Sequence, residues 1–149
     1  KSVGILPKEM TSKDIKDVIQ SFVTSAERAK RAGFDGVQLH GAHGYLLSEF
    51  LSPHMNKRTD DYGGSAENRV RIVTEIFEGI KELCGEDWPV LIKLQVDDFV
   101  KEKPSLKPPE SIEIARRIAE AGFDAIEISG GIYESGEELD PWYLQVRAT

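Results

Sequence analysis

Two histidines and a tyrosine lie close together in the segment His40-Gly41-Ala42-His43-Gly44-Tyr45, at the end of a short apolar stretch. Two imidazoles that converge on one point can bind a carbonyl or nitro oxygen on which negative charge develops, and a neighbouring phenol can deliver a proton. The same imidazoles can instead ligate a metal ion, for which Glu49 or His54 would supply a third ligand, or they can make structural hydrogen bonds only. The spacing alone leaves these three interpretations open.

Three helices, each followed by a strand, are predicted to position these residues. Apolar residues recur every three or four positions over 11–32, 67–83 and 110–121, which predicts helices. Short runs typical of strands follow at 35–40, 89–95 and 125–129, and the polar, glycine-rich segment 41–65 is predicted to be a loop. Local signals agree with the helix ends, because Thr11 and Asp14 predict a capping box, Gly33 a helix end, and Pro109 a first helical turn.

An internal repeat indicates how these units are arranged. Segments 32–41 and 121–130 align, each with Ala-Gly-Phe-Asp before a strand that ends in glycine. A repeated helix–strand unit with long loops after each strand is typical of an α/β protein with a parallel sheet, and repetition favours a barrel over a doubly wound sheet. A complete TIM (β/α)8 barrel takes about 250 residues. We therefore expect a partial TIM (β/α)8 barrel, about three to four βα units from the middle of the barrel, with a strand fragment around 3–6.

The composition excludes several other classes of protein. The chain has 149 residues, of which 40% are hydrophobic and 30% charged, and its formal net charge is -7. These values describe a globular domain rather than a disordered chain, and the negative charge disfavours binding to nucleic acid. The apolar runs are much shorter than a membrane helix requires, and the single cysteine, Cys84, fits a reducing compartment and a packing role. We expect a cytoplasmic protein whose partners include neither nucleic acid nor a membrane.

A longer segment around the histidines resembles a known family. The residues from His40 to Pro53, the run Asn56-Lys57-Arg58-Thr59-Asp60-Asp61-Tyr62-Gly63-Gly64-Ser65 and the triplet Glu67-Asn68-Arg69 closely resemble the central signature of the old yellow enzyme family of NADH:flavin oxidoreductases. A looser resemblance extends from Met10 to Gly131. It implies an eight-stranded barrel with FMN across its mouth, which takes hydride from NAD(P)H and passes it to an activated alkene such as an α,β-unsaturated carbonyl. Residues 1–149 would then be the central segment of a single FMN-binding (β/α)8 barrel domain.

The resemblance also implies roles for residues at the strand ends. His40 and His43 would bind the substrate carbonyl, where some members have histidine and then asparagine. Tyr45 would be the catalytic phenol that protonates the α-carbon. Lys93 would bind the cofactor in place of the arginine that many members carry beside the flavin ring, keeping the positive charge but losing the planar fork of the guanidinium. The alternative for Lys93 is an ammonium that simply extends to the rim of the barrel.

The segment 56–69 is expected to have a structural role. Gly63 and Gly64 can supply turn dihedral angles, and Ser65 can cap the helix that follows. Ion pairs of Arg58, Asp60 and Arg69 are expected to hold this long loop in place.

Polar and aromatic residues after the later strands receive weaker interpretations. Asp97 and Asp98 are expected to be solvated loop charges, with metal binding or acid–base chemistry as the alternative. Phe99 and Tyr133 are expected either to line a substrate pocket or to pack in the core or at the rim.

Two other functions compete with a flavin-dependent reductase at this point. One is a metal-dependent barrel lyase or hydrolase that uses His40, His43 and a carboxylate, and the other is an inert, truncated barrel segment. A barrel cut after a few strands exposes unpaired strand edges, so self-association or association with the rest of the barrel is expected. Barrels of this kind commonly bind phosphate after strands seven and eight, and no such segment follows 129–134. The 149-residue chain alone is therefore not expected to hold FMN.

Overall fold

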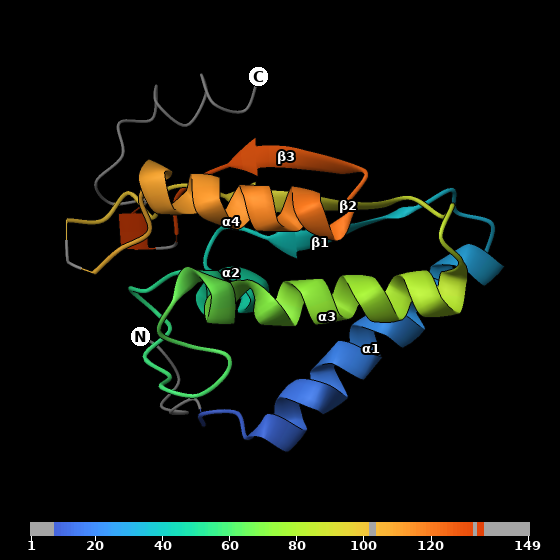
Figure 1. Cartoon of the computed structure of the whole chain (residues 1–149), viewed down its shortest axis with the longest axis horizontal. Coiled ribbons are helices and arrows are strands. Elements are labelled where there is room, and N and C mark those ends of the chain that lie inside the picture. The colour runs from blue at the N-terminus through green and yellow to red at the C-terminus, as the bar shows by residue number, and fades with distance from the viewer. Residues whose placement is uncertain (1–7, 102–103, 133, 136–149) are drawn as a thin grey trace.

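The computed structural model describes residues 8–101, 104–132 and 134–135. The elements, in chain order, are α1 (Ser12–Arg31), β1 (Val37–Gly41), α2 (Leu46–Leu51), α3 (Ala66–Cys84), β2 (Val90–Gln95), α4 (Pro108–Ala121) and β3 (Ala125–Ser129). Within the described residues, the strands form one parallel sheet in the order β1-β2-β3 (Figure 1). This is the predicted alternation of helices and parallel strands. The predicted strand fragment at 3–6 and the side chain of Tyr133 lie outside the described residues.

One face of the sheet forms the core with the helices. Leu39 of β1 and Ile92 of β2 are neighbours in the sheet and are 4% and 0% exposed. They belong to one apolar cluster with Ile15 of α1, Ile76 of α3 and Ile114 of α4. Helix α3 packs between α1 and α4 and contacts both of them (Figure 1). Burial of apolar area on this face is the main driving force for the arrangement.

The predicted helix ends are confirmed. Thr11 forms the capping box at the start of α1, because its Oγ1 accepts from the Asp14 N–H at 3.2 Å and its own N–H donates to Asp14 Oδ2 at 2.8 Å. Ser65 caps α3 by accepting from the Asn68 N–H at 3.2 Å. Gly33 and its counterpart in the repeat, Gly122, have φ values of 90° and 104°, which a residue with a side chain rarely adopts. The two repeated units therefore end their helices in the same way.

The segment 41–65 differs from the prediction of a continuous loop. It contains a short helix, α2, in which Leu47, Phe50 and Leu51 are buried against β1 and α3. Apolar residues at these spacings make one buried helical face. The helix is so short that it holds only a few of them, and its periodicity does not stand out among the surrounding glycines and polar residues.

A buried lysine fixes the end of the sheet at which β2 and β3 begin. Lys81, which is 7% exposed, donates from Nζ to the carbonyl oxygens of Glu86 and Trp88 at 2.9 Å each and lies 3.2 Å from Asp124 Oδ2. The Val90 N–H also donates to Asp124 Oδ2, at 2.8 Å, and this bond together with Lys81 lowers the pKa of the Asp124 carboxyl. The contact is remote from the strand ends that carry the histidines.

Two further properties follow from the described helices. Cys84, at the end of α3, is 2% exposed, and burial raises the pKa of its thiol, in agreement with the predicted packing role. None of the helices in the described part of the chain has the length and apolar character needed to cross a membrane.

Arg69 connects three parts of the fold. Its side chain is 3% exposed, its Nε donates to the carbonyl oxygen of Leu51 at 2.8 Å, and its Nη1 donates to the carbonyl oxygen of Gly64. Its Nη2 pairs with the Glu110 carboxylate in the first turn of α4. One guanidinium thus joins the end of α2, the loop before α3 and the start of α4.

Replacement of Arg69 is expected to destabilise the fold, because buried carbonyl groups and a carboxylate would lose their partner. Arg69→Met should lower the free energy of unfolding by about 2–3 kcal/mol in urea denaturation followed by circular dichroism. Arg116→Met is the control, because Arg116 forms its ion pairs with Glu113 and Glu120 at the surface, and its free energy of unfolding should be nearly unchanged. Equal losses in both variants would contradict the role of Arg69.

Candidate active site

A row of polar residues crosses the sheet on the face opposite the helices. The strand register pairs His40 with Lys93 and Lys93 with Glu127, so the three side chains project from the same face. The Lys93 ammonium lies 3.0 Å from Glu127 Oε1, and Gln38 Nε2 donates to Glu127 Oε2 at 2.8 Å. The bonds from Lys93 and Gln38 lower the pKa of Glu127. This face therefore carries a charge-balanced polar row where a barrel of this kind has its interior.

The predicted histidine and tyrosine residues come together at the carboxyl end of β1. The ring centroids of His40 and His43 are 5.4 Å apart, and those of His40 and Tyr45 are 5.1 Å apart. Tyr45 is 63% exposed and directly precedes α2. An imidazole pair and an accessible phenol thus share one edge of the sheet, and Lys93 lies beside His40 on the neighbouring strand.

A tight turn carries His43 over the end of the sheet. His43 and Gly44 have φ values of 65° and 77°, as the two central residues of a type I′ turn do, and the Tyr45 N–H donates to the Ala42 carbonyl oxygen at 3.4 Å. Gly44 adopts its left-handed conformation without a steric cost, since glycine has no side chain. The left-handed conformation of His43 was not predicted, and few residues other than glycine adopt it.

The surroundings of His43 favour its neutral form. Its Nε2 lies 2.6 Å from Ser129 Oγ at the end of β3. Burial lowers the pKa of His43, and the nearby His40 and Lys93 lower it further, whereas Glu127 opposes them. A neutral imidazole at neutral pH can donate one hydrogen bond and accept another, which suits it to bind an uncharged carbonyl group.

Three residues that the sequence interpretation gave no role belong to this arrangement, namely Gln95, Glu127 and Ser129. The internal repeat held a signal for two of them, because Glu127 aligns with Gln38 and Ser129 aligns with His40. Equivalent positions of a repeated βα unit occupy the same face of the sheet. Gln95 lies two residues after Lys93 on β2 and therefore projects from the same face of the sheet. Only the fold shows that its side chain is completely buried.

The expectation that Asp97 and Asp98 are solvated charges was wrong. They are 9% and 0% exposed. Asp97 Oδ1 accepts from the Phe99 N–H at 2.7 Å and lies 2.9 Å from the Lys107 ammonium. Asp98 accepts hydrogen bonds from several buried donors, including the Leu106 N–H at 2.7 Å. The loop after β2 folds back over these carboxylates because its backbone N–H groups need acceptors.

Glu49 and His54, either of which could have supplied a third metal ligand, lie away from His40 and His43. His54 Nε2 is 3.1 Å from Glu134 Oε2, and His54 lines a cleft with Glu49 whose lining includes neither His40 nor His43. Across the described ranges, no group of three or more histidine, cysteine or acidic side chains is arranged to hold a metal ion.

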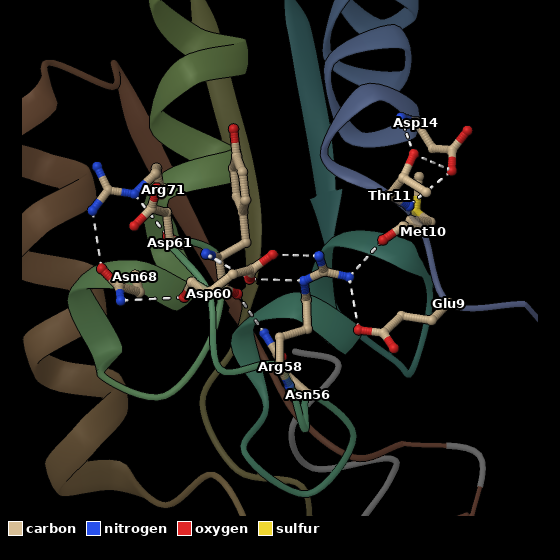
Figure 2. Close-up of polar contacts among 11 residues, drawn as sticks. Glu9, Met10, Thr11, Asp14, Asn56, Arg58, Asp60, Asp61, Asn68 and Arg71 are labelled. Atoms are coloured by element: carbon tan, nitrogen blue, oxygen red, sulfur yellow. Dashed lines mark hydrogen bonds and ion pairs between the residues drawn. The ribbon is translucent and has the colours of Figure 1, made fainter.

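The segment 56–69 has the predicted structural role (Figure 2). The Arg58 guanidinium pairs with the Asp60 carboxylate, with Nε 3.0 Å from Oδ1, and also donates to the Met10 carbonyl oxygen at 2.7 Å. Figure 2 shows it between Asp60 and Glu9, whose carboxylate it contacts at 3.2 Å. Arg71 Nε donates to the Asp61 carbonyl oxygen at 2.8 Å. These bonds attach the loop to the start of α1 and to α3.

The family model of the NADH:flavin oxidoreductase / NADH oxidase family matches residues 1–108. The chain belongs to this family. The matched region includes β1, the histidine turn, the segment 56–69 and β2 with Lys93. This confirms the resemblance seen in the sequence.

Two curated relatives are similar over most of the chain. An NADH oxidase from Thermoanaerobacter brockii is 47% identical over 133 residues, which are 89% of this chain and 20% of the relative. A cinnamate reductase from Clostridium sporogenes is 39% identical over 153 aligned positions, which cover 94% of this chain and 22% of the relative. The chain thus spans about a fifth of the length of these two relatives.

Solved structures of family members share the fold. A 2-naphthoyl-CoA reductase superposes with a TM-score of 0.81 at 38% identity, over 86% of this chain and 19% of that protein. An old yellow enzyme homologue from Zymomonas mobilis gives a TM-score of 0.72 at 27% identity, over 81% of this chain and 34% of that protein. The parallel sheet with its helices is therefore part of a TIM (β/α)8 barrel, as the sequence predicted.

The electrostatic surroundings of His43 generate a test that needs no substrate. Because Lys93 lowers the pKa of His43, Lys93→Met should raise that pKa toward its ordinary value of 6.5. The pKa is read from the imidazole chemical shifts in an NMR pH titration. Lys13→Met, on the exposed start of α1, is the control and should leave the titration unchanged. A pKa of His43 that is unmoved or lowered in Lys93→Met would show that the two side chains do not interact.

Proposed function

We propose that the protein is an FMN-dependent oxidoreductase of the old yellow enzyme type that reduces activated alkenes with NADH or NADPH. The observation that carries the proposal is the convergence of two imidazoles, one phenol and one ammonium at the carboxyl end of parallel strands. In TIM barrels this end carries the active site. The names of two relatives, cinnamate reductase and 2-naphthoyl-CoA reductase, support an unsaturated, carbonyl-conjugated substrate.

His40 and His43 are proposed to bind the carbonyl oxygen of the substrate. Their ring centroids lie 5.4 Å apart at 73° to one another, and both rings are proposed to face one substrate oxygen. Each imidazole can donate a hydrogen bond, and such donors stabilise the negative charge that the oxygen gains when hydride arrives at the β-carbon. The depressed pKa of His43 supports this, because it keeps His43 uncharged at neutral pH.

Tyr45 is proposed to deliver the proton to the α-carbon. Its ring lies 5.1 Å from that of His40, and its exposed side chain is free to approach a substrate held by the histidines. A phenol is neutral at pH 7, so it can donate a proton without first acquiring one.

Lys93 is proposed to bind FMN, and its place beside His40, near the carboxyl end of the sheet, fits a group that lies across the mouth of the barrel. The Lys93 side chain is 28% exposed and stands next to His40, and its ammonium, which pairs with Glu127, can also contact an electron-rich ring edge. Bound FMN would supply the hydride-transfer chemistry, which no side chain of this site can perform. The positive charge of Lys93 would stabilise the negative charge of a reduced flavin.

Residues 1–149 are proposed to be the central segment of one FMN-binding barrel domain. In the described residues β1 and β3 each pair with a strand on one side only. An unpaired edge and an uncovered polar face favour association with further strands of the barrel or with a second copy. The small-molecule substrate would bind at the carboxyl end of the strands, beside the histidines.

The two half-reactions test the proposed function. The protein, expressed from its whole reading frame, should show the visible absorption of an oxidised flavin. NADH or NADPH should bleach it, and cinnamaldehyde should restore it under anaerobic conditions. A protein that binds no flavin, or whose reduced flavin does not react with the alkene, would contradict the proposal.

Tyr45→Phe should separate these half-reactions. Loss of the proton donor should slow flavin reoxidation by the alkene at least about 100-fold, while reduction by the nicotinamide should keep nearly its full rate. Stopped-flow absorption measures both rates. If both fall by the same factor, Tyr45 positions the flavin and the proton has another source.

Lys93→Met should lower the midpoint potential of the bound flavin, because the reduced form loses a stabilising positive charge. A decrease of more than about 30 mV is expected in a spectroelectrochemical titration. Lys13→Met, far from the sheet edge, is again the control. A midpoint that is unchanged in Lys93→Met would show that the ammonium does not face the flavin.

A further inference from the structure

A chain of buried hydrogen bonds lies beneath the histidine turn. Gln95 Oε1 accepts from the His43 N–H at 2.8 Å, and Gln95 Nε2 donates to Asp98 Oδ1 at 2.5 Å. Asp98 Oδ2 accepts from Ser52 Oγ at 2.6 Å and from the Leu106 N–H at 2.7 Å. Gln95, Asp98 and Ser52 are each 0% exposed. The chain therefore joins the turn to the end of α2 and to the segment before α4.

His43 needs a partner of this kind because its backbone conformation is unfavourable. With φ at 65°, it occupies the left-handed region, which is strained for a residue with a side chain. The hydrogen bond that closes the turn, from the Tyr45 N–H to the Ala42 carbonyl, is long at 3.4 Å. The shorter bond from the His43 N–H to Gln95 is thus the closer restraint on the position of His43.

Asp98 determines which way the Gln95 amide faces. A carboxylate can only accept hydrogen bonds, and that of Asp98 already accepts from Ser52 Oγ and the Leu106 N–H, so the group that Gln95 turns toward it must be the Nε2 amino group. The carbonyl oxygen of the amide is then left for the His43 N–H. A reversed amide would place an NH₂ group against the His43 N–H, and neither could accept.

We propose that Gln95, oriented by Asp98, is a positioning residue that sets the place of the His43 imidazole. It acts through the His43 backbone and touches neither substrate nor cofactor. The inference rests on the proposed function in one respect, namely that His43 binds the substrate oxygen.

The hydrogen-bond pattern permits a reciprocal exchange that tests this directly. Gln95→Glu alone turns a carboxylate toward the Asp98 carboxylate, and Asp98→Asn alone removes one acceptor from a site that three donors address. In the double variant, the new carboxylate at position 95 can accept from both the His43 N–H and the new amide at position 98. The amide oxygen at position 98 can still accept from Ser52 and Leu106, so every bond is restored and the net charge is unchanged.

Binding of 4-hydroxybenzaldehyde to the oxidised, flavin-loaded protein gives the first measurement. Each single variant should weaken its binding about tenfold, and the double variant should return to within about twofold of the parent. In a His43→Ala background the same changes at 95 and 98 should alter binding by less than about twofold, because the imidazole that they position is gone. Lys81→Met is the control, because it also removes a buried polar group but does so near the start of β2, away from His43. It should leave the dissociation constant of the ligand unchanged.

Hydrogen exchange of the His43 backbone amide gives a second measurement that depends on neither ligand nor flavin. Exchange should be at least about tenfold faster in each single variant and should return to the parent rate in the double variant. The inference would be overturned if the double variant bound the ligand as weakly, or exchanged the His43 amide as fast, as the worse single variant. It would also be overturned if the changes at 95 and 98 altered ligand binding equally with and without the His43 imidazole. If His43→Ala alone leaves ligand binding unchanged, the proposed role of His43 is wrong, and the exchange rates still decide whether Gln95 holds the turn.

Discussion

The register of the parallel sheet is the constraint on which the site depends. Side chains alternate between the faces of a strand, so a shift of β2 by one residue would turn Lys93 into the helix-covered core and Ile92 out onto the open face. The complete burial of Ile92 and Leu94 against the helices makes that shift very costly. Apolar packing on one face therefore fixes the polar row His40, Lys93 and Glu127 on the other.

The end of the sheet is held by polar rather than apolar contacts. The left-handed turn at His43 is stabilised from below by Gln95 and at its ring by Ser129. Buried hydrogen bonds of this kind require every donor and acceptor to be satisfied, and Asp98 satisfies the remaining groups from two neighbouring segments. A site built this way holds its imidazole in one place before any ligand arrives, which is the condition for effective stabilisation of developing charge.

Much of this could be predicted from the sequence because it depends on local patterns. The alternation of helices and strands, the capping box at Thr11 and the structural role of Arg58 all follow from residues close together in the chain. The grouping of His40, His43 and Tyr45 was also accessible, since they are close together in the chain, at the end of β1 and in the turn that follows it. In contrast, the burial of Asp98 and the pairing of Lys93 with Glu127 depend on which segments meet across the sheet, and spacing along the chain does not contain that information. The short helix α2 was missed because one buried face of so few residues gives a weak periodic signal.

A crystal structure of the flavin-loaded protein with 4-hydroxybenzaldehyde would show whether the two histidines bind the oxygen of a ligand. We expect the flavin to lie across the carboxyl ends of the strands with Lys93 in contact, and the phenolic oxygen of the ligand to accept hydrogen bonds from both His40 and His43. A ligand oxygen out of reach of both imidazoles, or a flavin out of contact with Lys93, would contradict the proposed site.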